Sequence, residues 1–329
     1  MKKHKTLILD SNTIRRLIGI KDAMKAIEKV FRYFGQGKTE MPPKIYIHLD
    51  KYKGDFRAMP AYVEGLKSSI LKWVNVHPEN KKKGLPTVMA IIILSDPRNG
   101  YPLCIMDGTY ATALRTGAAG GIAAKYLARR DSRTLALLGC GAQAKTQLAA
   151  LCEVFAIDKV NTWDIKRSQS LSFLKGIRAL GLKTRISNSV RDCVKDCDIV
   201  VTTTPSRSPL VKLEWLKKGV HINAIGADAK GKRELDVRIL KRAKIVVDSW
   251  EQASYSGEIN VPLARGELSK KDIYADIGEI VTGKKKGRTS ADEITLFDST
   301  GLAVQDVAIA DVIYRKAVEA RAGKYVKFI

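Results

Sequence analysis

Apolar residues recur at three- and four-residue spacing between residues 12 and 35, and this spacing predicts an amphipathic helix. Gly35 and Gly37 mark its end. From Pro42 to Met106 the period falls to two, which predicts strands at 45–49, 70–76, 88–94 and 101–106. The turn sequence at 96–100 joins the last two, so we expect antiparallel hairpins here rather than a βαβ unit.

The second part of the chain alternates short apolar strands with helices. Small residues dominate a predicted helix at 109–129 and would let it approach a neighbour closely. Strands are then expected at 135–138, 160–163, 198–203, 220–225, 244–247 and 294–297. Helices are expected at 143–155, 170–180, 190–196, 235–243 and 302–320, and a last strand at 325–329. This order is typical of a parallel sheet covered on both faces.

A length of 329 residues suggests two domains. The fold class expected is α/β, with a Rossmann-type doubly wound parallel sheet domain plus an α+β domain. The boundaries predicted are 119–299 for the first, and 1–118 with 300–329 for the second.

Composition excludes several classes of protein. Hydrophobic residues make up 45% of the chain, too many for a disordered protein. The longest apolar run, Val88–Leu94, is far too short to span a bilayer, and only Leu7–Leu9 follows the basic N-terminus. We therefore expect a soluble, cytoplasmic protein that contacts no membrane. The five cysteines form neither a disulfide framework nor a zinc set, so no metal is expected.

The formal net charge of +24 would attract nucleic acid non-specifically. However, the basic residues are spread along the chain, aromatic residues make up only 7%, and no nucleic-acid-binding motif is present. No specific nucleic acid partner is expected. The charge is interpreted as a feature for solubility and for attracting anions such as a dinucleotide or a small carboxylate.

A glycine motif follows the strand predicted at 134–138. Gly139, Gly141 and Ala144 match G-x-G-x-x-G/A at the start of the next helix, whose N-terminus would bind a pyrophosphate. The next strand ends at Asp164, 20 residues past Ala144, as expected for a carboxylate that binds a ribose 2′-hydroxyl. Asp164 favours NAD. Lys166 and Arg167 could offset its repulsion of a 2′-phosphate, so NADP stays open.

Two more predicted strands end in polar or glycine-containing turns, at 202–205 and 222–228. Ligands bind at strand carboxyl ends in such folds. The N-terminal half offers four basic residues in apolar stretches, Lys44, Arg57, Lys72 and Arg115. A buried Lys72 would have a depressed pKa suited to proton transfer, whereas an edge-strand lysine would simply extend its ammonium to water.

Ten segments of the chain resemble the ornithine cyclodeaminase/μ-crystallin family, and within it the archaeal-type alanine dehydrogenases. They are MPPKIYI (41–47), FRAMPA (56–61), LKWVNVHPEN (71–80), GLPTVMA (84–90), ATALRTGAAGG (111–121), LLGCGAQA (137–144), TTTPSR (202–207), INAIGAD (222–228), GEIN (257–260) and FDSTGLAVQD (297–306).

This resemblance implies a homodimer formed through the substrate-binding domain, and roles for particular residues. Lys72 and Asp228 would transfer protons, and Lys44 and Arg115 would bind the substrate carboxylate. The charge of Arg57 suits it to the same carboxylate. Gly139, Gly141, Lys166 and Arg167 are already expected at the cofactor from the glycine motif and its surroundings. The cofactor-binding residues that the resemblance implies are Thr87, Arg115, Ala142, Gln143, Asp164, Thr204, Ile222, Asn223, Ala224, Ile225, Lys232 and Ser299.

One departure bears on the substrate. The cyclodeaminases carry an acidic residue just before a Met-Pro pair, whereas this chain has Arg57 in Phe56–Pro60, which would repel an ornithine side chain. We therefore expect NAD-dependent reversible oxidative deamination of a small L-amino acid, with L-alanine as the leading candidate substrate. Ornithine cyclodeamination, cyclic ketimine reduction and a crystallin-like nucleotide-binding protein are the alternatives.

Overall fold

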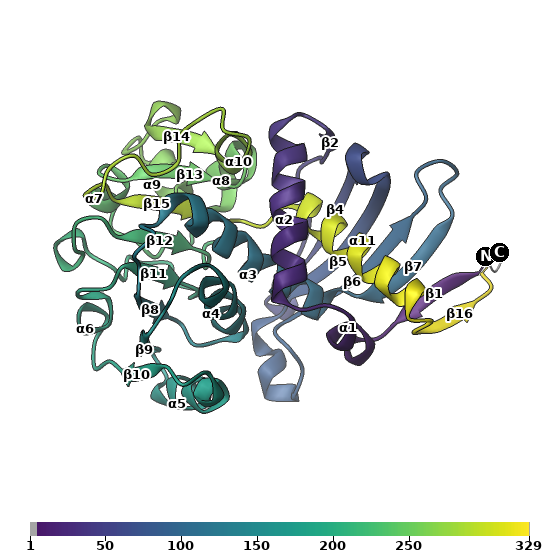
Figure 1. Cartoon of the computed structure of the whole chain (residues 1–329), viewed down its shortest axis with the longest axis horizontal. Coiled ribbons are helices and arrows are strands. Elements are labelled where there is room, and N and C mark those ends of the chain that lie inside the picture. Colours follow the sequence, from purple (N-terminus) through teal and green to yellow (C-terminus); the bar gives the residue numbers. More distant parts are fainter. Residues whose placement is uncertain (1–4, 329) are drawn as a thin grey trace. The chain divides into compact units, whose positions relative to one another are not determined.

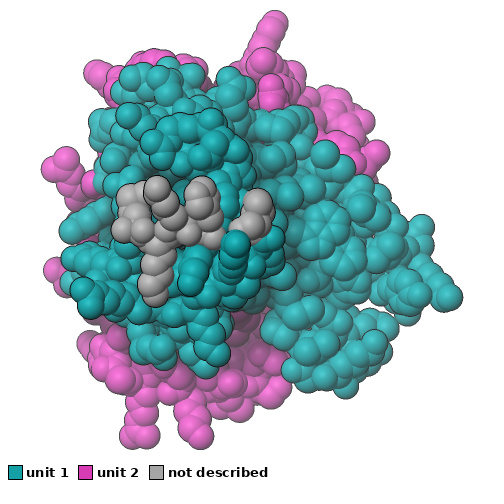
Figure 2. Space-filling view, turned by 90° about the vertical axis from the view of Figure 1, so that its right-hand side faces the viewer, with its two compact units in different colours: residues 1–115, 302–329 teal, residues 116–301 magenta. Residues whose placement is uncertain are grey.

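The computed structural model describes residues 5–328, which form two compact units. Unit 1 runs to Arg115 and resumes at Leu302, and unit 2 comprises Thr116–Gly301 (Figure 2). The domain limits predicted from the sequence lie a few residues from these divisions. The first four residues and Ile329, the end of the strand expected at 325–329, lie outside the described chain.

Unit 1 is built on a mixed sheet with strand order β16-β1-β7-β6-β5-β4-β2, and β3 also pairs with β4. Only β1 and β7 run parallel among these pairs. The strands are β1 (Thr6–Leu9), β2 (Thr39–Glu40), β3 (Ile45–Leu49), β4 (Gly54–Val63), β5 (Ser68–Val76), β6 (Val88–Ser95), β7 (Pro102–Asp107) and β16 (Lys324–Val326). The antiparallel hairpins expected between residues 42 and 106 are confirmed.

Helices cover one face of this sheet. They are α1 (Ser11–Leu17), α2 (Ile20–Gly35) and α11 (Ala303–Glu319). The last helix packs on β4, β5 and β6 and on α2 (Figure 1). The single helix expected at 12–35 is wrong, because Ile18 and Gly19 are extended and Asp22 accepts a hydrogen bond from the Gly19 N–H at the start of α2.

Unit 2 contains an eight-stranded sheet whose pairs are all parallel. Its order, β10-β9-β8-β11-β12-β15-β13-β14, places β8 and β11 side by side at the point where the chain reverses direction across the sheet. The strands are β8 (Thr134–Leu138), β9 (Lys159–Trp163), β10 (Lys183–Ile186), β11 (Ile199–Thr202), β12 (His221–Ala224), β13 (Lys244–Val247), β14 (Ile273–Asp276) and β15 (Thr295–Asp298). Strands β10 and β14 were not predicted.

Both faces of this sheet are buried, which confirms the doubly wound fold. Along β8, Leu135 and Leu137 pack into one apolar cluster, and Ala136 and Leu138 pack into the other. The helices are α3 (Gly108–Leu127), which begins in unit 1, α4 (Ala142–Val154), α5 (Arg167–Ile177), α6 (Val190–Val194), α7 (Val237–Leu240), α8 (Trp250–Ser256), α9 (Asn260–Ala264) and α10 (Ile277–Val281).

Glycines let α3 lie close against α4, as the small-residue pattern predicted. A Cβ added at Gly117 would overlap the backbone of Thr146, and one at Gly120 would overlap the side-chain amide of Gln147. That amide donates to the Thr116 carbonyl at 2.9 Å.

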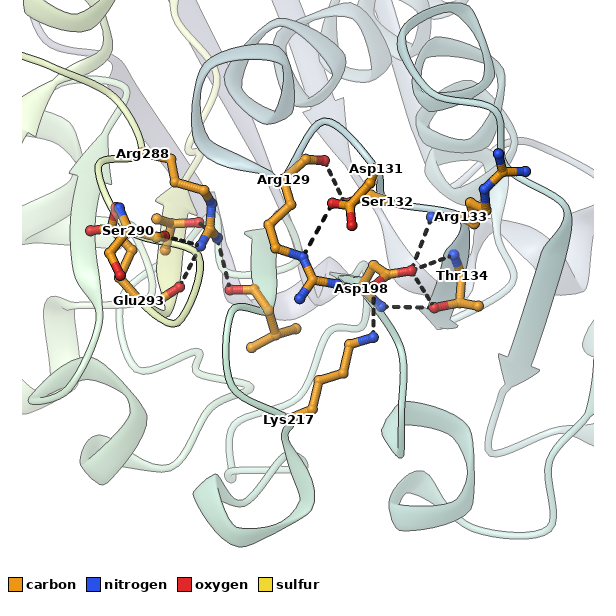
Figure 3. A network of polar contacts seen from close by, with 12 residues as sticks. Arg129, Asp131, Ser132, Arg133, Thr134, Asp198, Lys217, Arg288, Ser290 and Glu293 are labelled. Carbon is orange, nitrogen blue, oxygen red and sulfur yellow. Dashed lines mark hydrogen bonds and ion pairs between the residues drawn. The ribbon is translucent and has the colours of Figure 1, made fainter.

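A polar network holds the amino ends of the central strands (Figure 3). Asp198, just before β11, accepts hydrogen bonds from the backbone N–H groups of Arg133 and Thr134, at 2.9 and 2.8 Å, and from the Lys217 ammonium at 2.6 Å. Arg129 donates to the same carboxylate at 2.5 Å. Although burial alone raises the pKa of Asp198, these donors hold it well below its ordinary value. The network lies opposite the strand ends that bind ligands in such folds, so its role is to stabilise the sheet.

Candidate functional site

The turn between β8 and α4 has the geometry of a phosphate-binding loop. Gly139 adopts a φ of +88°, and a Cβ added there would lie 3.0 Å from the Thr203 carbonyl oxygen. Gly141 is the N-cap of α4, and apart from its two chain neighbours no described residue comes within 4 Å of where its Cβ would be. The turn therefore packs tightly on the end of β11 and leaves open space before the first turn of α4, beginning at Ala142. The exposed N–H groups of a helix start favour an anion there.

Asp164 follows β9 and is tied to this turn. One carboxylate oxygen accepts the Cys140 N–H and the other accepts the Lys166 N–H, both at 2.9 Å. Lys166 and Arg167 begin α5 and are exposed. The carboxylate thus has a fixed position beside the glycine turn, as a ribose-binding group requires, and two cations lie next to it in the sequence.

Several buried polar atoms in this region lack a protein partner. Gln143 Oε1 and Ser299 Oγ make no hydrogen bond with any residue from 5 to 328. In unit 1, Thr87 Oγ1 is also buried and makes no hydrogen bond with any of these residues. A buried polar group without a partner is costly, and a ligand that supplies one removes the cost. All three residues were predicted to bind the cofactor, and within unit 2 Gln143 and Ser299 fit a dinucleotide held by the glycine turn and Asp164.

Glu234 organises the ends of β11 and β12. Its carboxylate accepts the Thr204 N–H and hydroxyl, both at 2.7 Å, the Thr202 hydroxyl at 2.6 Å and the Gly226 N–H at 3.0 Å. The hydroxyl of Thr204, a predicted cofactor residue, is therefore committed to Glu234. Burial raises the pKa of Glu234.

Two more buried carboxyls continue this chain of contacts. Glu258 accepts the Glu234 and Leu235 N–H groups, and Asp298 accepts the N–H groups of Glu258 and Ile259. Burial raises the pKa of Glu258 well above its usual range and that of Asp298 to about 8. Three successive carboxyl side chains thus hold the backbone behind the strand ends.

Residues 222–225 were predicted as cofactor contacts, but their side chains face the interior. Ile222 and Ala224 lie in one apolar cluster and Ile225 in the other. Asn223 donates to the Gly120 carbonyl at 3.1 Å. Only the backbone at this strand end is placed to meet a ligand.

Asp228 and Lys232, predicted for different roles, form an ion pair in unit 2. The Lys232 Nζ lies 2.5 Å from Asp228 Oδ1, and about a third of the Asp228 side chain, 31%, is exposed.

Lys72 lies in the middle of the unit 1 sheet. It is opposite Met59 on β4 and Ile92 on β6, and only 1% of its side chain is exposed. This excludes an edge-strand lysine that reaches water. Its Nζ lies 2.5 Å from Asp306 Oδ2. Burial, with repulsion from Arg115, lowers the pKa of Lys72 to about 7 against the opposing attraction of Asp306.

The other predicted substrate residues of unit 1 differ in their surroundings. Arg115 is buried and donates to Asp306 and Gln305. Arg57 lies on the same sheet face as Lys72, where Asp55 accepts two hydrogen bonds from it, at 2.7 and 3.2 Å. Lys44 is half-buried before β3 and its charge lowers the pKa of Lys72.

Asp306 and Glu234 are the residues that sequence reasoning missed. Asp306 lies within the FDSTGLAVQD segment, among apolar residues of the helix predicted at 302–320. A carboxylate on the apolar side of a helix is a signal for a buried counter-ion. Glu234 carried no comparable signal, because its donors Thr202, Thr204 and Gly226 lie at the ends of two separate strands, which only the folded sheet brings together.

The strand order, the glycine turn and the placement of Asp164 define a Rossmann-type α/β protein with a second, α+β unit. A sequence model of the ornithine cyclodeaminase/mu-crystallin family matches residues 4–321, and the chain belongs to this family.

Three relatives are informative. The alanine dehydrogenase of Archaeoglobus fulgidus is 51% identical, over 98% of both chains. The structure of an archaeal alanine dehydrogenase dimer with bound NAD has a TM-score of 0.95 and 51% identity, covering 99% of this chain and 100% of the other. The Δ1-pyrroline-2-carboxylate reductase of Thermococcus litoralis, solved with NADH and L-proline, has a TM-score of 0.95 and 40% identity, covering 98% and 100%. The residues described from 5 to 328 include no helix long and apolar enough to cross a bilayer.

Proposed function

We propose that the protein is an NAD-dependent oxidoreductase that catalyses reversible oxidative deamination of a small L-amino acid, with L-alanine as the leading candidate substrate. The observation that carries the proposal is Lys72, an almost fully buried amine beside Asp306 and Arg115. The 51% identity to an alanine dehydrogenase supports the choice of substrate.

The cofactor would be held in unit 2 by the glycine turn, the start of α4 and Asp164, and when bound would accept a hydride from the substrate Cα. The Asp164 carboxylate can accept a hydrogen bond from the ribose 2′-hydroxyl of NAD, whereas it would repel the 2′-phosphate of NADP. The unpartnered Gln143 Oε1 and Ser299 Oγ would gain hydrogen-bond partners.

Residues of the chain would perform the remaining steps. Lys44, Arg57 and Arg115 would bind the substrate carboxylate by charge-assisted hydrogen bonds. The lowered pKa of Lys72, about 7, would leave a large share of this amine neutral at neutral pH, and the neutral amine would take a proton from the water that attacks the imino carbon. Asp228 would exchange a proton with the departing amine. In the reverse direction the same groups would assist amination of pyruvate.

The protein would act as a homodimer through the uncovered face of the unit 1 sheet. Ile45, Ile47, Trp73 and Ile91 lie there with 62%, 48%, 39% and 52% of their surface exposed. Strand pairing places Ile45, Ala58, Trp73 and Ile91 in one row. Exposed apolar patches of this kind mark protein interfaces, and the similar archaeal structure is a dimer.

Reduction of a cyclic imino acid is the second candidate, favoured by the 40% identity to a Δ1-pyrroline-2-carboxylate reductase. The deciding experiment follows NADH absorbance with pyruvate plus ammonium and, separately, with Δ1-pyrroline-2-carboxylate, and identifies the products. Higher kcat/KM with pyruvate supports the proposal. Higher kcat/KM with the cyclic substrate selects the second candidate. Cofactor binding without turnover on a panel of amino, keto and imino acids would indicate a nucleotide-binding protein.

A further inference from the structure

The side chain of Asp306 joins two cations inside unit 1. It lies in the first turn of α11 and is fully buried. One oxygen lies 2.5 Å from Lys72 Nζ, and the other lies 3.3 Å from Arg115 Nε. The two cations come from β5 and α3, so a single carboxylate fixes the position of two elements.

Gln305 fixes the guanidinium of Arg115 from a second direction. Its Oε1 accepts from Arg115 Nη1 at 3.0 Å and from the Leu302 N–H at 3.3 Å. The amide cannot be reversed, because its NH₂ group would then face two donors. Arg115 is thus held at two nitrogens and cannot move away from Lys72 without breaking both contacts.

The charges that face Lys72 come from three directions. Asp306 of α11 attracts its ammonium, whereas Arg115 of α3 and the half-buried Lys44 repel it. On β4 and β6 its paired neighbours, Met59 and Ile92, are apolar. Asp306 is therefore the one carboxylate in hydrogen-bond contact with Lys72 among residues 5–328.

The next carboxylate along α11 has other partners. Asp311 accepts from the Ser68 hydroxyl at 2.9 Å and pairs with Arg315 at 3.0 Å. It shares the helix and the burial of Asp306 but not the contact with Lys72. The neighbouring Arg57 is paired with Asp55.

We propose that Asp306 is a positioning residue for proton transfer: it holds the Lys72 amine in place beside Arg115 and determines how readily that amine carries its proton. This inference deepens the proposed function and rests on it. When Lys72 carries its proton, the two cations and one carboxylate of this cluster have a net charge of +1, which one substrate carboxylate would neutralise.

A purely structural ion pair is the alternative. Buried ion pairs contribute little net stability because desolvation offsets their attraction, so stability alone does not account for this one. The two explanations differ in one measurable quantity, the titration of Lys72.

The test is an NMR titration of protein labelled with ¹³Cε-lysine, without substrate or cofactor. The Lys72 signal is assigned by its absence in Lys72→Met. In Asp306→Asn the amine loses the anionic partner that it has among residues 5–328, so its titration midpoint should fall by at least about one pH unit, a tenfold change in its protonation ratio. The matched control, Asp311→Asn, should leave the midpoint unchanged. An unchanged midpoint in folded Asp306→Asn overturns the proposal.

A second variant covers the case in which Asp306→Asn does not fold. Arg115→Met removes the cation that repels Lys72 and also competes with it for Asp306, so the Lys72 titration midpoint should rise. A midpoint that stays or falls contradicts the coupling of the three groups.

Kinetics separates this inference from the proposed function. The deamination rate needs a neutral amine and should rise with pH through the Lys72 titration. In Asp306→Asn that limb should move to lower pH by the interval that NMR measures. A shifted NMR midpoint in a protein without deaminase activity would leave the positioning role intact and refute the function. If Asp306→Asn is active and the pH dependence of its rate stays at the wild-type position although the NMR midpoint has shifted, the function is supported and the role of Asp306 in the chemical step is refuted.

Discussion

The backbone N–H of Cys140 donates a 2.9 Å hydrogen bond to the carboxylate of Asp164, so the glycine turn and the end of the next strand are joined directly. The carboxylate therefore holds the turn that precedes α4, and in the proposed function the same carboxylate would bind the ribose of the cofactor.

Asp164→Ala should narrow the preference for NAD over NADP. The change removes a ribose hydrogen bond and a charge that repels the 2′-phosphate, and it leaves Lys166 and Arg167 able to meet that phosphate. The ratio of kcat/KM for the two cofactors measures the effect. Asp158→Ala, just before the opposite end of β9, should leave the ratio as it is. A wild-type protein that already prefers NADP strongly would contradict the role of Asp164.

Arg57→Glu should lose activity with alanine or pyruvate. The substitution removes a charge-assisted hydrogen bond worth about 1.5–3 kcal/mol, or roughly 10- to 150-fold in binding. It also sets a second carboxylate against Asp55, the present partner of Arg57. Arg57→Lys keeps the charge and should lose less. Unchanged KM and kcat in Arg57→Glu would remove this residue from the site.

Lys72→Ala and Asp228→Asn should each lower turnover and leave NADH affinity near wild type, because the glycine turn and Asp164 are untouched. General acid–base catalysis contributes about 10²- to 10⁴-fold, so each loss should reach that range. If both groups serve one step, the double variant should be barely worse than the poorer single variant. Turnover within a few-fold of wild type in both folded single variants would refute the assignment.

Trp73→Glu, Ile91→Glu or both should shift the protein from dimer to monomer, because a charge would enter the apolar face of the unit 1 sheet. Sedimentation velocity measures the change, and far-ultraviolet circular dichroism checks that the variants fold. Leu171→Glu, an exposed leucine of α5 in unit 2, is the control and should leave the mass unchanged. A monomeric wild type would refute the proposed interface.

Asp198→Ala should destabilise the protein by about 3 kcal/mol, because it leaves buried donors and cations without their acceptor. The folded-state pKa of Asp198 is depressed, so its contribution is complete above the unfolded value near 3.9 and is lost as pH falls toward the folded value. The difference in free energy of unfolding should therefore be constant above about pH 5 and shrink below pH 4.

Denaturant unfolding across this pH range measures the effect. Asp131→Ala is the control from the same network, since 81% of the Asp131 side chain is exposed. A difference between Asp198→Ala and wild type that does not change between pH 5 and pH 2 would contradict the depressed pKa.

Strong local periodicity made most of the fold predictable. The strand predicted at 244–247 matches β13, because three consecutive β-branched residues are buried on both faces. Strand β4 was missed because Gly54, Asp55 and Pro60 interrupt its pattern. Pro60 is tolerated because it lies between the segments that pair with β3, up to Ala58, and with β2, from Tyr62. A proline there has no ladder hydrogen bond to lose on that side.

The nucleotide-binding part of the site was predictable from the sequence, whereas the surroundings of Lys72 were not. Gly139 and Asp164 belong to a motif with fixed spacing, so local sequence was enough. The burial of Lys72 depends on strands on both sides and on Asp306, 234 residues away, and no local pattern carries that information. The roles assigned to the individual site residues remain predictions.

Unit 1 is assembled from both ends of the chain, and this affects the order of events during synthesis. The ribosome releases Lys72 long before α11, so the growing chain carries this amine without Asp306 until the last helix emerges. Strand β1 likewise lacks its partner strand β16 until the end of the chain is synthesised. The intervening unit 2 has local strand–helix contacts and can fold while unit 1 is incomplete, because domains generally fold as units during synthesis. A nascent chain that stops before residue 302 would therefore carry a cofactor-binding unit attached to an unfinished sheet, and molecular chaperones would meet this protein mainly through its N-terminal third.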